Sequence, residues 1–179
     1  IEDLPAEIRA LLISAAVRHD SSTTLINSLI NTHGTTSSAE LKGDIASGLT
    51  SSKDTDTIKR LLSLLTDTAI IRSQDTARWF AYLIRNKHAR TLTWEWMVNN
   101  WDWIVATFGG DKSFDDFPRY SATGLLLQEE LDAYIAFFAD KKQHQALVRV
   151  IALGETEIRS RVELIERDKD AVCAGLLEL

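Results

Sequence analysis

The histidines and the single cysteine are the side chains that would have to hold a catalytic or structural zinc ion. The sequence has one cysteine, Cys173, and four histidines: His19, His33, His88 and His144. A zinc protease places two histidines one helical turn apart with a glutamate beside the first, and a structural site needs four ligands. The histidines are too far apart in sequence to form such a pair. We therefore predict no catalytic residue, no metal site and no cofactor in this chain, and we interpret the histidines as surface or capping residues.

Charged side chains gather at two other places. Asp115 and Asp116 are adjacent in a polar loop, where such carboxylates are more often solvated or capping groups than ligands of a divalent cation. The one compact basic cluster comprises Arg85, Lys87, His88 and Arg90. Because guanidinium groups present fixed donors that match a carboxylate, this cluster is a candidate site for a peptide carboxylate or for the acidic edge of a neighbouring domain. The alternative is a solvated basic turn between two helices.

The composition sets bounds on partners and compartment. The chain has 179 residues, a net charge of −6 and a pI near 5.2. This acidic balance argues against nucleic acid as the main partner, since phosphate binding needs a concentrated basic face. No apolar run approaches the roughly 20 residues that span a membrane, and the first residues lack the pattern of a signal peptide. A lone cysteine excludes an internal disulfide. From these features we expect a cytoplasmic protein without a membrane segment.

Apolar residues recur at helical spacing along the whole chain. Residues 1–66 contain four such stretches separated by polar residues, which predicts two helical hairpins of about 30 residues each. Hairpins of this length are typical of α-solenoid repeats of the HEAT or armadillo kind. Further helical stretches cover residues 75–86, 91–110, 129–139, 143–153 and 155–177. The sequence thus predicts one all-α domain over residues 1–179, built as a HEAT/armadillo-like superhelical array of about ten antiparallel helices.

Residues 91–110, TLTWEWMVNNWDWIVATFGG, hold four of the five tryptophans. In a single helix Trp94 and Trp101 fall on one face, and Trp96 and Trp103 fall on the opposite face, about 180° away at roughly 100° per residue. Burial of a large side chain contributes roughly 1.5–3 kcal/mol, so neither face is expected to remain in water. We predict that these four tryptophans organise the core and that the glycine pair at 109–110 ends the helix.

Five stretches of the chain resemble the C-terminal helical domain of zinc aminopeptidases, the family that includes aminopeptidase N, puromycin-sensitive aminopeptidase and the endoplasmic-reticulum aminopeptidases. They are IRSQD (71–75), LIRNKHAR (83–90), TWEWMVNNWDWI (93–104), FGGDKSFDDFPRY (108–120) and IERDKDAV (165–172). The resemblance covers essentially the whole chain and is best over residues 67–179, whereas residues 1–66 match mainly in helix spacing. One departure is Leu126-Leu127, which stands where many relatives cap a late helix with serine and threonine and leaves the start of the helix near Gln128 open.

The resemblance implies a non-catalytic domain of a zinc-dependent aminopeptidase that removes N-terminal residues from peptides. In such enzymes the zinc ion belongs to the catalytic domain of the parent chain, which would be the partner of this domain. The helical domain caps the active site and shapes the chamber that peptides enter. Neither the zinc motif nor the exopeptidase motif occurs in this sequence, so we expect the chain alone to be inactive. The alternative is a free-standing HEAT-like scaffold that binds a protein partner through its concave face.

The two ends of the helix predicted at residues 75–86 are candidates for lining the peptide chamber. Gln74 and Asp75 lie at its start, and Arg85, Asn86 and Arg90 lie at its end. Twelve residues at 1.5 Å rise separate the ends by roughly 18 Å, so only one of them can lie on the rim. We favour the Arg85 end because guanidinium donors suit a peptide carboxylate. In the alternative, Gln74 and Asp75 line the chamber and the basic turn faces solvent.

Overall fold

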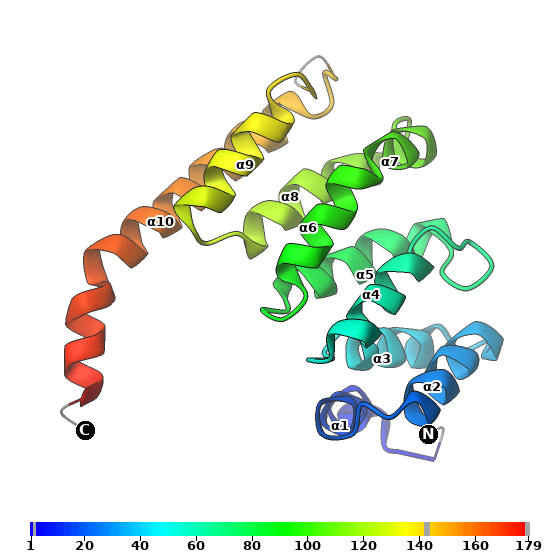
Figure 1. The fold of residues 1–179 in the computed structure, drawn as a ribbon. Coiled ribbons are helices and arrows are strands. Elements are labelled where there is room, and N and C mark those ends of the chain that lie inside the picture. The colour runs from blue at the N-terminus through cyan, green and yellow to red at the C-terminus, as the bar shows by residue number, and fades with distance from the viewer. Residues whose placement is uncertain (2, 142–143, 178–179) are drawn as a thin grey trace. The chain divides into compact units, whose positions relative to one another are not determined.

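The computed structural model describes residues 1, 3–141 and 144–177. Within these ranges every regular element is helical: ten α-helices and one short 3₁₀-helix follow one another, and no strand occurs (Figure 1). The prediction of an all-α fold is confirmed, while the HEAT-like superhelical arrangement stays a prediction. The chain divides into two compact units, Ile1–Gly110 and Asp111–Leu179. The prediction of a single domain over the whole chain likewise stays a prediction.

The first unit begins with four helices that polar residues separate. Three of them start at a polar cap: Ser22, Ser38 and Asp54 accept hydrogen bonds from the backbone N–H groups three residues later, at 3.4, 3.2 and 2.8 Å. Such caps satisfy N–H groups that have no partner inside the helix. The helices are α1 (Ala6–His19), α2 (Thr23–Thr35), α3 (Ala39–Leu49) and α4 (Thr55–Leu64). This confirms the helix pattern predicted for residues 1–66.

Helix α1 packs closely against α3 at a glycine. A Cβ atom at Gly48 would lie only 2.2 Å from Cγ2 of Ile13, so the lack of a side chain permits this approach. Ile13 is buried in the contact, and the Arg9 guanidinium pairs with the Asp44 carboxylate at 3.2 Å beside it. The contact fixes α1 on α3 and thereby holds the last turn of α1, which carries Arg18, near the end of α3.

The predicted tryptophan helix is in fact two helices, α6 (Arg90–Asn99) and α7 (Trp101–Phe108), which follow α5 (Ser73–Arg85). The break falls at Asn100, whose φ and ψ of −110° and 19° are not helical. The Asn100 side-chain amide donates to the Trp96 carbonyl at 2.8 Å, and the Asn100 backbone N–H donates to the same oxygen at 2.9 Å. An asparagine that bonds to nearby backbone in this way competes with helix continuation. The prediction of one helix over residues 91–110 is therefore wrong.

The four tryptophans of this segment differ in burial. Trp96 and Trp101 are 9% and 7% exposed, whereas Trp94 and Trp103 are half-buried. The rings of Trp96 and Trp103 meet edge to face with centroids 6.2 Å apart, which links α6 to α7 across the break. The fifth tryptophan, Trp79 of α5, is only 2% exposed. The most deeply buried indole thus lies in α5, outside the segment predicted to organise the core.

The second unit comprises the 3₁₀-helix η1 (Lys112–Asp115), α8 (Asp116–Gly124), α9 (Gln128–Phe138) and α10 (Val148–Leu177). Helix α9 starts at Gln128 without a serine or threonine cap. Instead the Glu130 carboxylate accepts hydrogen bonds from the N–H groups of Leu126 and Leu127 at 2.6 and 3.0 Å. The glutamate half of the usual capping box is therefore present without the serine or threonine half, and the helix starts at Gln128 all the same.

Helix α10 is continuous from Val148 to Leu177, so the predicted break between residues 153 and 155 is wrong. Residue 143, where the first of the two predicted helices would begin, lies outside the described residues. Gly154 does not end a helix but lies buried within α10, where a Cβ atom would come within 2.3 Å of the Tyr134 hydroxyl. The Tyr134 hydroxyl donates to the Pro118 carbonyl at 3.3 Å. Close packing of α10 against α8 and α9 therefore explains the glycine.

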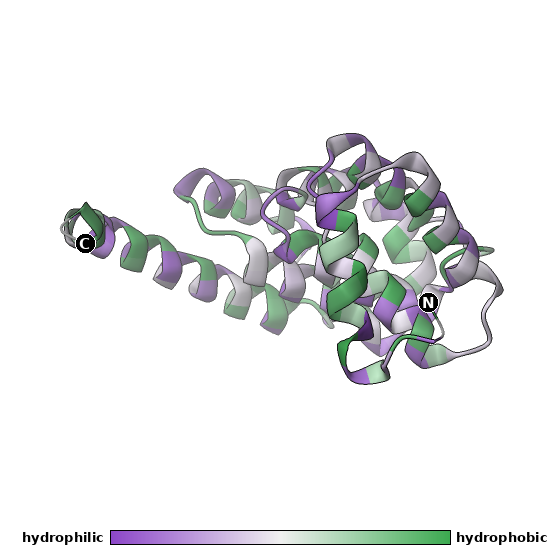
Figure 2. Ribbon diagram, turned by 90° about the horizontal axis from the view of Figure 1, so that it is seen from below, coloured by the Kyte–Doolittle hydropathy of each residue, from purple (hydrophilic) through white to green (hydrophobic). Residues whose placement is uncertain are grey.

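Beyond Val162 no residue of α10 is buried, and hydrophobic and hydrophilic residues alternate along its ribbon (Figure 2). Exposed apolar side chains in this stretch include Leu164, Val172 and Leu176. None of the helices in the described part of the chain combines the length and the apolar character that crossing a membrane requires. The second half of α10 thus presents an amphipathic surface with no partner inside its own unit.

Candidate basic site at the ends of three helices

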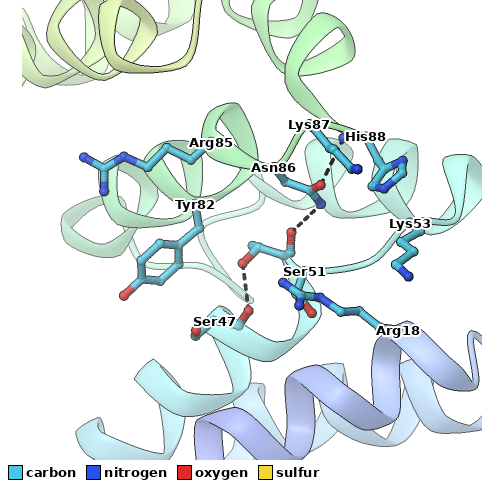
Figure 3. Close-up of a pocket in the computed structure, with 10 residues that line it drawn as sticks. Arg18, Ser47, Ser51, Lys53, Tyr82, Arg85, Asn86, Lys87 and His88 are labelled. Atoms are coloured by element: carbon cyan, nitrogen blue, oxygen red, sulfur yellow. Dashed lines mark hydrogen bonds between the residues drawn. The ribbon is translucent and has the colours of Figure 1, made fainter. Parts of the chain in front are cut away.

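A pocket of about 590 Å³ opens in the first unit where α1, α3 and α5 end (Figure 3). This volume falls within the range of about 300–1,000 Å³ that is usual for ligand pockets. We call it the basic pocket and define it by its lining residues, which are Arg18, Ser47, Thr50, Ser51, Lys53, Tyr82, Arg85, Asn86, Lys87 and His88. It therefore contains most of the basic cluster that the sequence singled out, together with two cations from distant segments, Arg18 and Lys53.

Asn86 fixes the backbone around this pocket. It follows the last residue of α5, and its side-chain amide donates to the carbonyl oxygens of Thr50 and Ser52 at 2.9 and 2.7 Å. Its side-chain oxygen accepts a hydrogen bond from the His88 N–H at 3.0 Å, and its backbone oxygen accepts from the N–H of Arg90 at 2.9 Å. Asn86 thus joins the end of α5 to the end of α3 and to the start of α6. Both of its amide hydrogens are used for this, so it acts as a positioning residue.

The hydroxyl groups at the end of α3 are also engaged by the protein. The Thr50 hydroxyl donates to the Ala46 carbonyl at 2.7 Å, and the Ser51 hydroxyl donates to the Gly48 carbonyl at 2.7 Å. Hydroxyl donors of this kind complete the last turn of a helix, whose carbonyl groups have no partner further along. The hydroxyl groups in the wall of the pocket thus already have hydrogen-bond partners within the protein. The charged side chains around the pocket therefore determine what it attracts.

Four permanently charged cations surround the basic pocket, and all four are exposed: Arg18, Lys53, Arg85 and Lys87. Figure 3 places Tyr82 and Arg85 on one side of Asn86 and Lys87 and His88 on the other, with Arg18 reaching from α1 toward Ser51. No acidic residue belongs to the lining within the described ranges, although the chain as a whole carries a charge of −6. Clustered cations of this density raise the local concentration of anions, and guanidinium and ammonium groups bind carboxylates directly. The site is therefore suited to an anionic group.

A second, smaller pocket of about 170 Å³ borders the opposite end of α5. We call it the His33 pocket, and its lining comprises His33, Ala39, Lys42, Gly43, Ala46, Arg72, Gln74, Asp75, Arg78 and Trp79. Asp75 pairs with Arg72 at 2.9 Å. The interpretation of His33 as a surface or capping residue is wrong, because its side chain is only 3% exposed and its ring meets that of Trp79 edge to face at 5.2 Å. Its position one and two helical turns after Leu29 and Ile26 places it on the buried face of α2.

The structure separates the five residues predicted to line the peptide chamber into two groups. Arg85 and Asn86 line the basic pocket, while Gln74 and Asp75 line the His33 pocket at the other end of α5. Arg90 lines neither of these two pockets; it is half-buried, and its Nε has no hydrogen-bond partner among the described residues. Which end of α5 faces a peptide stays a prediction.

The sequence reading missed Arg18 and Lys53 because each stands alone in its own segment. Arg18 lies in the last turn of α1, and Lys53 lies in the polar connection between α3 and α4. Lys53 has no basic residue beside it and Arg18 has only His19, so a search for clusters of lysine and arginine does not find them. Both lie at or just after the end of a helix, and the packing of α1 on α3 brings these two helix ends together.

Among the described residues, histidine, cysteine and acidic side chains form no group of three that could hold a metal ion. Asp116 pairs with Arg119 at the start of α8, and Cys173 is exposed on α10. The described residues thus do not fit a zinc site, which needs three or four such ligands.

The chain is similar in sequence to a known domain family and to several known proteins. The family model of the ERAP1-like C-terminal domain matches residues 1–160. The chain is 34% identical over 176 residues to aminopeptidase N of Lactococcus lactis subsp. lactis, which is 98% of this chain and 21% of that protein. It is 30% identical over 181 residues to aminopeptidase N of Lactobacillus delbrueckii subsp. lactis, covering 99% of this chain and 22% of the relative.

A more distant similarity, 30% identity over 105 residues, connects the chain to glutamyl aminopeptidase of Mus musculus, with 59% of this chain and 11% of that protein aligned. The chain thus spans about a fifth of the length of the bacterial relatives and less of the mammalian one. Family match and bacterial relatives agree over nearly the whole sequence, and the chain belongs to the family of ERAP1-like C-terminal domains, the helical domain of aminopeptidase N-like enzymes.

Proposed function

We propose that this chain is the non-catalytic helical domain of a zinc-dependent aminopeptidase that removes N-terminal residues from peptides. In this proposal it caps the active site and shapes the chamber that peptides enter. The zinc ion would be held by another part of the parent protein, since the described residues here do not fit a zinc site. The observation that carries the proposal is the alignment of almost the whole chain with about a fifth of each bacterial aminopeptidase N.

Exposed apolar side chains support a domain that packs on further protein. Ile8, Leu11 and Leu12 on α1 are 44%, 69% and 39% exposed. The second half of α10 likewise exposes apolar side chains, among them Leu164, Val172 and Leu176. A free-standing scaffold would be expected to present a polar, charged groove instead, whereas contiguous exposed apolar surface marks an interaction site. The basic pocket is polar, but it occupies the helix ends and not these helix faces.

Within this function the basic pocket receives the C-terminal carboxylate of a peptide. Peptide substrates have one carboxylate that every sequence shares, and four surrounding cations provide a sequence-independent attraction for it. The pocket volume of about 590 Å³ accommodates a terminal residue together with its carboxylate. Binding there would contribute to affinity only for peptides long enough to reach from the catalytic zinc to the pocket, which would make the enzyme sensitive to peptide length.

The experiment compares peptides that end in a free carboxylate with the same peptides ending in an amide, using the complete enzyme. Replacing both Lys53 and Lys87 by Gln should raise KM for the free-acid peptides about 3- to 10-fold, since exposed ion pairs contribute roughly 0.2–1 kcal/mol each. KM for the amides should stay unchanged. The matched control replaces Lys59 and Arg60, exposed cations on α4 outside both pockets, and should leave both values unchanged. Equal effects on acids and amides would contradict carboxylate binding.

A further inference from the structure

The His33 pocket has a charge balance that the peptide-chamber proposal does not use. Three cations, Lys42, Arg72 and Arg78, line it together with a single carboxylate, Asp75. Arg72 and Asp75 pair with each other at 2.9 Å, so the positive charges of Lys42 and Arg78 remain in excess. The Arg78 guanidinium lies against the glycine in the wall, since a Cβ atom at Gly43 would be 3.9 Å from its Nη1. The pocket therefore carries two positive charges more than its own acid balances.

A buried nitrogen without a partner provides a second and independent observation. Nδ1 of His33 has no hydrogen-bond partner among the described residues, although the side chain is only 3% exposed and lines the pocket. Burial lowers the pKa of the His33 imidazole below its ordinary value, and the charges of Lys42 and Arg72 lower it further, against the opposing effects of Asp75 and of a hydrogen bond to the Ile70 backbone. The ring is thus neutral near pH 7. Buried polar atoms are nearly always satisfied in folded proteins, so an unsatisfied one that lines a pocket is expected to pair with a group from outside the chain.

The start of α5 adds a third attraction for anions. Gln74 and Asp75 belong to its first turn and line the pocket, and no side chain caps this helix start within the described ranges. The Asp75 N–H donates to the Arg72 carbonyl at 2.7 Å, while the two N–H groups before it have no partner inside this 13-residue helix, whose start is also the positive end of its dipole. Cations, helix start and buried imidazole therefore converge on one small volume.

Size and charge select the class of ligand. At about 170 Å³ the pocket is smaller than the roughly 300 Å³ at which sites for larger organic ligands begin, so it fits a group of a few heavy atoms. An excess of two positive charges matches a dianion better than a single carboxylate. From this combination of lining, volume and unsatisfied imidazole we propose that the His33 pocket binds inorganic phosphate as the dianion. Its oxygens accept from Lys42, Arg78 and the start of α5, and the single hydroxyl of the hydrogen phosphate dianion donates to Nδ1 of the neutral His33 ring.

The experiment titrates inorganic phosphate into the 179-residue chain at constant ionic strength and follows the imidazole resonances of His33 by NMR. A saturable single-site shift is expected. Replacing Lys42 or Arg78 by Gln should weaken binding about 1.5- to 5-fold for each side chain removed, as for other partly exposed ion pairs. Two matched controls, the Lys59→Gln/Arg60→Gln pair on α4 and the Lys53→Gln/Lys87→Gln pair of the basic pocket, should leave the His33 shift unchanged. O-phosphoserine serves as a second probe, and the pocket volume predicts that it binds more weakly than free phosphate.

Three outcomes would overturn the proposal. One is the absence of a saturable shift of the His33 resonances. Another is a loss of the shift in the basic-pocket variant, which would place the phosphate there and not beside His33. The third is tighter binding of O-phosphoserine, which would make a phosphorylated chain the ligand and not the free ion. His33→Phe adds a test that does not depend on surface charge: it keeps a ring against Trp79, so the variant should fold while losing any phosphate-induced rise in melting temperature.

Discussion

Replacing Asn86 by Ala tests whether this side chain holds the basic pocket together. The change removes two hydrogen bonds to the Thr50 and Ser52 carbonyls, at 2.9 and 2.7 Å, and one from the His88 N–H at 3.0 Å. Thr50 and Ser52 are 2% and 0% exposed, so water cannot readily replace the lost donor. A buried group left unsatisfied costs about 1–3 kcal/mol. With two such carbonyls, partly relieved by relaxation, we expect the free energy of unfolding of the first unit to fall by about 2–4 kcal/mol.

The assay is urea unfolding followed by tryptophan fluorescence. All five tryptophans lie between positions 79 and 103, so the signal reports the first unit without contribution from the second. Asn31→Ala, at an exposed position of α2, is the matched control and should change the free energy of unfolding by less than about 0.5 kcal/mol. If Asn86→Ala unfolds like the control, the hydrogen bonds to Thr50 and Ser52 do not hold α3 and α5 together, and the account of how the pocket is positioned fails.

Two further predictions concern packing and pH. Gly154→Ala should destabilise the second unit by about 1–3 kcal/mol, because the new methyl group would meet the Tyr134 hydroxyl at 2.3 Å; hydrogen exchange of α10 measures this, and Gly175→Ala, which meets nothing within 4 Å, should be neutral or stabilising. Because burial lowers the pKa of His33, its neutral form stabilises the first unit fully above the ordinary pKa of about 6.5, and this contribution is lost as pH falls below it. The fluorescence-detected melting temperature should therefore drop as the pH falls below about 6.5 in the parent chain and drop less in His33→Phe; an equal drop in both would refute this role of His33.

Much of the helical pattern could be predicted because helix caps and apolar spacing are visible in short stretches of sequence. Ser22 and Asp54 are recognisable caps, and the apolar spacing that follows each of them leaves little alternative to a helix. Two features were misread because the same signal has two meanings. The apolar spacing at residues 91–108 continues in register across Asn100, so periodicity does not reveal that this side chain bonds back to Trp96. A glycine ends many helices, yet Gly154 is there to admit Tyr134 from another helix.

The candidate sites show the same limit. Arg85, Lys87 and His88 are neighbours in sequence, so their half of the basic pocket is visible before folding. The other half arrives through the contact of α1 with α3, which depends on Gly48 and Ile13 and has no signature in the charges themselves. His33 illustrates the converse: its burial follows from the face of α2 that it shares with Ile26 and Leu29, but its pocket depends on side chains from α3 and α5.

Positive charge at the end of a helix is favourable even when no ligand binds. Cations at helix ends therefore say less about what the basic pocket binds than cations elsewhere. Arg18 lies in the last turn of α1 and Arg85 is the last residue of α5, where a cation is stabilised by roughly 0.3–1 kcal/mol through the helix dipole. These two side chains would be favourable there even if nothing bound. Lys53 and Lys87 lie outside the helices and gain nothing comparable, yet they face the same pocket and bring two further charges close to the others. The helix dipole thus does not account for these two lysines, so they, more than the arginines, are the cations that the carboxylate proposal explains.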